Sequence, residues 1–194
     1  MHHIHHTEGL ILGSNNYREA DKYYAIFTRD LGMIYASAQG VRKMSSKLRY
    51  VLQDFSYVKL DLVRGKDFWR LTSASKTNLL GRISNNNSTL SVFVNISNLL
   101  KRLLAGEESN PELFSDLVRG FSVLEKAQNE IEVRNIEIIM VLRILNNLGY
   151  VGDNNKEIEK LVKSPFEEDV IFEAGRQRSK ILNEINKALS ETHL

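Results

Sequence analysis

The stretch Gln-Gly-Val-Arg-Lys-Met-Ser-Ser-Lys-Leu-Arg-Tyr-Val-Leu-Gln-Asp-Phe, residues 39–55, decides how the first part of the chain is interpreted. It follows a strand-like segment, and no acidic residue occurs between Asp30 and Asp54. Its four cations are Arg42, Lys43, Lys47 and Arg49. A glycine-led basic loop between two strands of a small β domain suits a phosphate backbone. The alternative is an ordinary connecting loop with solvated lysines and arginines.

Five strand-like segments surround this loop, at residues 7–13, 23–29, 32–39, 55–64 and 67–75. The fourth alternates between apolar residues such as Val58 and Leu60 and residues expected to point outward, such as Tyr57 and Lys59. Tight turns at residues 30–31 and 65–66 join antiparallel neighbours. Five strands with a longer excursion between the third and fourth predict an OB-fold, a barrel that binds single-stranded nucleic acid across its strand face and loops.

After a polar segment at residues 84–88, the chain is predicted to be helical. We expect one helix capped by Ser88 or Thr89, and another with Asn110 as its N-cap and Pro111 in its first turn. The segment 131–148 is apolar nearly all round, which predicts a central helix with Gly149 as its C-cap. A short helix at residues 156–163 and a last helix with apolar residues at 181–189 follow. The sequence therefore predicts an α+β protein with a barrel domain at residues 1–80 and a helical domain at 81–194.

Composition limits the function further. The 194 residues carry a net charge of +2, but residues 1–80 alone have 12 Lys and Arg against 7 Asp and Glu. The basic excess thus lies in the β part of the chain. Cysteine is absent, which excludes disulfides, thiolate zinc sites and cysteine nucleophiles. The sequence opens with no signal peptide and contains no apolar run of membrane-spanning length, so we expect a cytoplasmic protein.

Catalytic and metal sites are not predicted. Histidines at positions 2, 3, 5 and 6 could chelate a transition metal, but they precede the first predicted strand, and we assign no metal or cofactor to them. Asp54, Asp61 and Asp67 could form a nuclease carboxylate set only if they converged, which the strand pattern does not favour. No Walker loop, metalloprotease helix or dinucleotide-binding motif is present. We therefore expect a protein that is not an enzyme.

Four successive segments resemble the N-terminal domain of the RecO family of recombination mediator proteins. They lie at residues 7–14, 16–22 and 26–32 and in the basic loop at 39–55. Arg134-Asn-Ile-Glu137, followed by Leu148-Gly149-Tyr150, resembles the signature of the family's helical domain. The resemblance spans roughly residues 7–150. Many members carry a four-cysteine zinc site after the Leu-Gly-Tyr element, whereas this chain has Asp153-Asn154-Asn155 there.

The resemblance implies a bacterial DNA repair protein without chemistry of its own, associated with the nucleoid. It would bind single- and double-stranded DNA and anneal complementary strands. It would also contact the C-terminal tail of the single-strand DNA-binding protein SSB, and work with RecR to load RecA on SSB-coated DNA. An RNA-binding OB-fold protein and a protein-interaction scaffold are the alternatives.

The candidate site residues follow from the loop, the turns and the resemblance. We expect phosphate contacts from the four loop cations and from three residues at turns and strand ends, Arg29, Arg64 and Lys66. Tyr17, Tyr35, Tyr50 and Tyr57 are candidates for base stacking, with half-buried strand positions as the alternative. The resemblance makes Arg134 the docking point for the SSB tail, and an ion pair with Glu137 is the alternative. The cations at residues 176–180 are interpreted as a solvated helix face.

Overall fold

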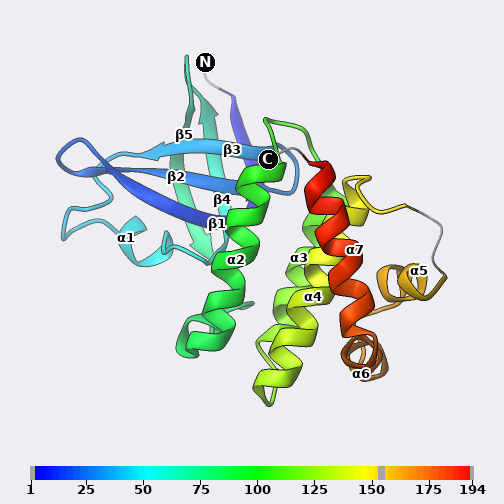
Figure 1. Ribbon diagram of the computed structural model, residues 1–194. Helices are drawn as coiled ribbons and strands as arrows, with labels where there is room; N and C mark the ends of the chain where they lie inside the picture. Colours follow the sequence, from blue (N-terminus) through cyan, green and yellow to red (C-terminus); the bar gives the residue numbers. More distant parts are fainter. Residues whose placement is uncertain (1–2, 153–155, 193–194) are drawn as a thin grey trace.

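The first part of the chain folds into a closed barrel. The computed structural model describes residues 3–152 and 156–192. The five strands are β1 (Ile4–Tyr17), β2 (Asp21–Thr28), β3 (Gly32–Ala38), β4 (Tyr57–Arg64) and β5 (Trp69–Lys76). They close in the order β1-β2-β3-β5-β4, with β3 and β5 parallel and every other pair antiparallel (Figure 1). This arrangement confirms the predicted OB-fold barrel.

Side chains that alternate inward along the strands fill the barrel, and a short helix closes one end of it. Gly9 leaves room in the interior, because a Cβ atom there would lie 2.7 Å from Cγ2 of Ile26. The helix α1 (Leu48–Val51) lies in the long connection between β3 and β4. Val41 and Leu52, at either side of it, are buried in the barrel core, and the hydroxyl of Tyr24 donates to the carbonyl of Leu52 at 3.3 Å.

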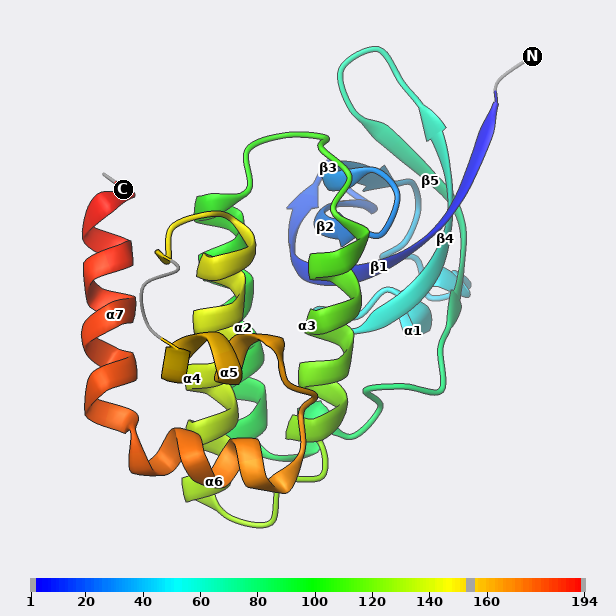
Figure 2. The same cartoon turned by 90° about the vertical axis from the view of Figure 1, so that its right-hand side faces the viewer.

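The second part of the chain is helical. A 3-10 turn, η1 (Ile83–Asn85), precedes α2 (Asn87–Leu103), α3 (Pro111–Leu124), α4 (Glu130–Asn147), α5 (Lys156–Lys163), α6 (Glu168–Arg176) and α7 (Arg178–Glu191). In Figure 2, α2, α3, α4 and α7 stand side by side, and α6 crosses below them. Helix α4 contacts α2, α3, α5, α6 and α7. The sequence correctly predicted this central position, because apolar residues occur on nearly all sides of the helix.

Two N-caps differ in how well the sequence predicted them. Asn110 caps α3 as expected, since its side chain accepts from the backbone N–H of Leu113 at 3.0 Å. The cap of α2, however, is Asn86, whose side chain accepts from the N–H of Ser88 at 2.8 Å. The predicted caps Ser88 and Thr89 were wrong because both lie inside the helix, where the hydroxyl of Thr89 donates to a carbonyl of the preceding turn.

The C-terminal end of the chain forms two helices where one was predicted. The C-cap of α4 is Leu148, and Gly149, predicted as the cap, follows it with a φ of +81° as the glycine that ends the helix. Beyond Pro165, α6 and α7 meet at Gln177. Helix α6 was missed because it buries only Val170 and Ala174, too few apolar residues for a clear stripe.

The barrel and the helices share one apolar core. Leu10, Phe27 and Met33 point out of the barrel and belong to the same buried cluster as the apolar residues of α2, α3 and α4. The rings of Phe27 and Phe114 lie 5.7 Å apart, as centroids, across this junction. Burial of such rings stabilises a fold by about 1.5–3 kcal/mol each. The outer face of the barrel near the β2–β3 turn is therefore closed to solvent.

A buried arginine fixes the region after α4. Arg143 is only 5% exposed, and its guanidinium donates to Oδ1 of Asp116 at 3.0 Å and to the carbonyl oxygens of Leu161 and Ser164. It also lies 4.0 Å from the ring centroid of Phe166. Burial lowers the pKa of Arg143, and the neighbouring carboxylate of Asp116 opposes that shift. One side chain thus joins α3, α4 and α5 to the segment that leads into α6.

Within the described ranges, no helix is both long enough and apolar enough to cross a membrane.

Candidate nucleic-acid interface

The outer face of β2 and β3 is divided into a covered half and an open half. Near the β2–β3 turn, Phe27 and Met33 are buried under the helices. At the other end of the same strands, Tyr23 is half-buried and Tyr35 is 46% exposed. Because side chains alternate along a strand, these residues point outward while Tyr24 and Ile34 fill the barrel. The open half is thus a strand surface with aromatic side chains in contact with solvent.

Four side chains form an aromatic cluster on this surface: Tyr17, Tyr23, Tyr35 and Phe68. The rings of Tyr23 and Tyr35 are stacked, with centroids 5.8 Å apart and planes 5° apart. Phe68, from the β4–β5 turn, meets Tyr23 edge-on at 5.6 Å and Tyr17 at 6.3 Å. Burial, with Tyr35 and Tyr17 nearby, raises the pKa of Tyr23. The exposed ring of Tyr35, with the partly buried rings beside it, can stack on an unpaired base.

Cations border the aromatic cluster. Arg18, in the β1–β2 turn, places its guanidinium 5.2 Å from the ring centroid of Tyr17. Lys66 is exposed in the β4–β5 turn, and Arg70 is exposed on β5 beside Ser37 of β3. The two turns and the β2–β3 surface are the parts of an OB-fold that bind oligonucleotides.

The basic loop, residues 39–55, adjoins the β1–β2 turn. Gly40, with a φ of +63°, donates its N–H to Oδ1 of Asp21 at 2.7 Å. The next residues attach the loop to the β1–β2 turn, since the N–H of Arg42 donates to the carbonyl of Ala20 and its guanidinium to the carbonyl of Glu19. The loop therefore begins beside the aromatic cluster and continues away from it along the barrel.

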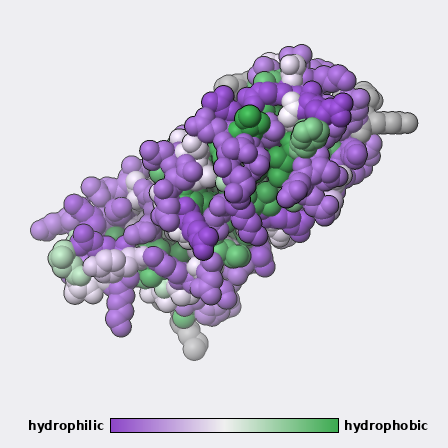
Figure 3. All heavy atoms as spheres, turned by 90° about the horizontal axis from the view of Figure 1, so that it is seen from below, coloured by the Kyte–Doolittle hydropathy of each residue, from purple (hydrophilic) through white to green (hydrophobic). Residues whose placement is uncertain are grey.

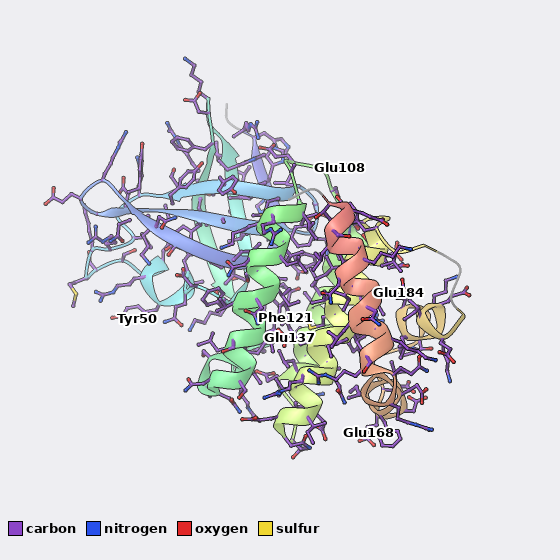
Figure 4. All side chains as sticks on the ribbon, viewed as in Figure 1. Tyr50, Glu108, Phe121, Glu137, Glu168 and Glu184 are labelled. Carbon is purple, nitrogen blue, oxygen red and sulfur yellow. The ribbon has the colours of Figure 1, made fainter. Side chains whose placement is uncertain are left out.

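All four loop cations predicted to contact phosphates are exposed, and they lie in this one loop: Arg42, Lys43, Lys47 and Arg49. Tyr50, in α1, is 60% exposed, and Figure 4 shows it at the lower edge of the barrel. Val41 and Leu52 anchor the loop in the barrel core. Both ends of the loop are thus fixed in the core, and its charged side chains lie in solvent.

Arg29 and Arg64 lie apart from this loop, and each is paired with a carboxylate. Arg29 binds Oε2 of Glu8 at 2.9 Å and lies 5.5 Å from the ring centroid of Phe114, at the junction with the helices. Arg64 pairs with Glu107, in the loop between α2 and α3, and its guanidinium lies over the ring of Trp69. Their charges are compensated within the protein, so they contribute less to an anion-binding surface.

Tyr57 lies on the outer face of β4, as the strand pattern predicted, but the expected exposure to solvent is wrong. It was expected on the outer, solvated face of β4, but its side chain is buried against Phe114 of α3, at 6.0 Å between ring centroids. Its hydroxyl donates to Oε2 of Glu8 at 2.8 Å. Burial and this hydrogen bond raise the pKa of Tyr57 to about 12. The ring points outward from the barrel, as alternation requires, but the helices cover it, so it has no free face for a base.

Arg134 lies in a shallow pocket between α2 and α4. The pocket volume is about 240 Å³, and its lining includes Val92, Asn95, Arg134 and Glu137. Arg134 is exposed and lies 3.7 Å from Glu130, an i,i+4 pair that contributes little to stability in solvent. The alternative pair with Glu137 is not the one formed, because Glu137 accepts from the side-chain amide of Asn95 at 2.8 Å and bridges α4 to α2. Figure 4 shows Glu137 between these two helices.

Two of the N-terminal histidines, His5 and His6, lie at the start of β1. The ring of His5 packs edge-on against Trp69 at 5.0 Å, and Nδ1 of His6 lies 2.6 Å from Oδ1 of Asp61. His2 and the Asp153–Asn155 segment lie outside the described residues. Among the residues that are described, no cluster of three or more His, Cys, Asp or Glu could hold a metal ion.

Two members of the aromatic cluster were not predicted. Tyr23 precedes the inward-facing Tyr24 and Ile26, so strand alternation alone places it on the outer face with Tyr35. Phe68 follows Gly65, Lys66 and Asp67 in a turn, and an aromatic side chain in a polar turn indicates a surface role. Both signals were present in the sequence, but the convergence of the β4–β5 turn on β2 required the barrel.

These features define a class: a protein in which an OB-fold barrel, with solvated aromatic and basic side chains, is joined through a common core to an α-helical bundle. Two family models match the chain in the same order. Recombination protein O N terminal matches residues 1–79, and Recombination protein O C terminal matches residues 86–158. The chain belongs to the RecO family of DNA repair proteins.

Curated relatives support this assignment. The DNA repair protein RecO of Heliobacterium modesticaldum is 29% identical over 147 residues, covering 76% of this chain and 52% of the relative. That of Clostridium novyi is 28% identical over 155 residues, covering 79% and 59%. That of Alkaliphilus metalliredigens is 28% identical over 126 residues, covering 65% and 51%. The chain thus spans between about half and three fifths of the length of these relatives.

Proposed function

We propose that this protein binds single- and double-stranded DNA and anneals complementary strands as a recombination mediator. The observation that carries the proposal is the open half of the β2–β3 face, where the aromatic cluster meets the cations of two turns and of the basic loop. Membership of the RecO family supports DNA as the nucleic acid. The site acts by binding alone, and it would place the protein at the nucleoid.

Each group of side chains has a distinct part in this proposal. Tyr23 and Tyr35 would stack on unpaired bases, which are available in single strands and not in a duplex. The loop cations Arg42, Lys43, Lys47 and Arg49, with Lys66 in the β4–β5 turn, would contact phosphates in either form of DNA. Cations on one face also reduce the repulsion between two strands, which favours annealing.

The helical bundle would recruit the strand to be annealed. We propose that Arg134 binds the acidic, carboxylate-ending tail of SSB, because its guanidinium is exposed at a pocket that also contains the apolar side chains of Val92 and Val133. Cooperation with RecR in loading RecA on SSB-coated DNA is part of the same proposal, and it rests on the family alone.

The test is fluorescence anisotropy with labelled single-stranded DNA, duplex DNA and RNA at several salt concentrations, followed by addition of a complementary strand. We expect salt-sensitive DNA binding and faster annealing. Binding confined to RNA would favour an RNA-binding OB-fold protein, and no binding to any nucleic acid would favour a scaffold.

Tail binding needs a separate measurement. A synthetic acidic peptide that ends in an aromatic residue and a free carboxylate should bind the wild-type protein and lose affinity for Arg134→Ala. Arg119→Ala, which removes an exposed cation of α3, is the matched control. Equal binding to all three proteins would remove the role proposed for Arg134.

A further inference from the structure

An open groove lies at the end of the bundle away from the barrel, between the start of α4 and α6. Its volume is about 1150 Å³. Its apolar lining includes Ile131 and Phe172 at the surface, with Val123, Ala127, Ile136, Phe166 and Ile171. Figure 3 shows apolar surface among hydrophilic residues over this end of the molecule. The α4–α6 groove is separate from the Arg134 pocket, which lies on the α2 side of α4.

Two large apolar side chains at this groove are exposed to solvent. Ile131, in the first turn of α4, is 71% exposed, and Phe172, in α6, is 68% exposed. Exposed apolar residues that gather around a depression indicate an interaction site more strongly than scattered ones. Ile136 and Phe166 are buried and line the base of the groove.

The rim of the groove is acidic. Its charged residues are Glu132, Glu167, Glu168 and Asp169, against a single lysine, Lys126. Glu132 is engaged in capping α4, since it accepts from the N–H of Gln128 at 2.8 Å. The other three carboxylates open α6, where the helix dipole favours them. In the described part of the chain, no Lys, Arg or His lies within ion-pair distance of any of these carboxylates. Figure 4 shows Glu168 at the outer edge of this end.

We propose that the α4–α6 groove docks a basic amphipathic helix of a partner protein. Apolar side chains spaced three and four residues apart would pack against Ile131 and Phe172, and lysines or arginines beside them would meet the acidic rim. An α-helix is about 10 Å across with its side chains, and an open groove of about 1150 Å³ is large enough to take one face of such a helix. The acidic rim excludes an acidic tail of the kind proposed for Arg134, so the two sites take ligands of opposite charge.

The test uses the complete chain and a fluorescein-labelled 18-residue peptide of leucine and lysine at helical spacing. Two matched peptides replace lysine by glutamate or place a proline in the centre. Ile131→Ser and Phe172→Ser remove the apolar contacts, and Glu168→Lys reverses a rim charge. Leu182→Ser and Glu191→Lys, on α7, are the matched controls outside the groove. Circular dichroism checks that each variant is folded, which we expect because the substituted side chains are exposed.

We expect the basic helical peptide to bind the wild-type protein about tenfold more tightly than Ile131→Ser or Phe172→Ser, the usual scale for an apolar anchor. Glu168→Lys should weaken binding several-fold, and added salt should reduce the difference. Leu182→Ser and Glu191→Lys should bind like the wild type. Equal affinity for the glutamate or proline peptide, or for the groove variants, would overturn the proposal. So would a wild-type dimer that Phe172→Ser converts to a monomer, because a second copy of the chain would then cover the groove.

Discussion

Two sets of substitutions should separate the two contributions to single-stranded DNA binding. Arg42→Gln with Lys43→Gln removes two exposed charges of the basic loop, and Tyr35→Ala removes one face of the stacked tyrosine pair. The loop charges act through electrostatic contacts with phosphates, and Tyr35 acts through base stacking. The two variants should therefore differ in how their affinity depends on salt, and not only in how much affinity they lose.

The magnitudes follow from the number of contacts removed. Each phosphate contact contributes about 0.7 to the slope of log affinity against log salt concentration on single strands, so the double variant should lose about 1.4 from that slope. Tyr35 is 46% exposed and stacked at 5.8 Å on Tyr23. Loss of one base stack costs about 1–3 kcal/mol, or roughly 5- to 150-fold in affinity, with the slope unchanged.

The assay is anisotropy of a labelled oligonucleotide at four or more salt concentrations, with duplex DNA in parallel. Tyr35→Ala should weaken binding to the single strand more than to the duplex, because bases in a duplex are already stacked. Lys126→Gln with Lys187→Gln removes the same charge from the helical bundle and is the control. A loop variant with the wild-type slope, or a tyrosine variant with wild-type affinity, would refute the assignment of that group.

Three further predictions concern the stability of the fold. Arg143→Ala should lower the free energy of unfolding in urea by about 3–5 kcal/mol, because it leaves the partners of a buried guanidinium unpaired, whereas the exposed Arg119→Ala should change it little. Gly32→Ala should lower the free energy of unfolding by about 2 kcal/mol or more, because Gly32 has a φ of +68° and the added Cβ would lie 2.2 Å from the carbonyl oxygen of Glu108. Gly152→Ala is the control and should be nearly neutral, because no atom lies within contact distance of the added Cβ. The raised pKa of Tyr57 means that its neutral form stabilises the fold fully below pH 10, and that this contribution declines as the pH rises toward 12. Tyr57→Phe should therefore show a smaller loss of stability than the wild type over that interval in thermal unfolding, and equal losses would contradict the burial argument.

The sequence predicted the elements well where their signals are local. Alternation in β4 and the cap at Asn110 depend on residues within a few positions, and both are confirmed. The central position of α4 was also predictable, because a helix without a polar face must be covered on all sides. Helix α6 was missed because little of its surface is buried.

Features of the site that depend on distant residues were less predictable. Alternation placed Tyr57 outside the barrel, but it carries no information on whether α3 covers that face. The pairing of Arg29 with Glu8 and of Arg64 with Glu107 likewise joins segments that only the tertiary fold brings together. The basic loop was recognisable as a run of charges, whereas the aromatic cluster needed the strand register and the β4–β5 turn.

The continuous core between barrel and helices has a consequence for dissecting the molecule. Cutting the chain near residue 80, at the boundary between the two family models, would leave Leu10, Phe27 and Met33 on one fragment and Phe114 on the other facing water. Each fragment would then be prone to aggregate through a surface that the intact chain never exposes. The same junction packs the barrel directly against the bundle, with buried side chains from both sides. We expect an oligonucleotide on the barrel and a peptide on the bundle to keep the separation that this junction sets.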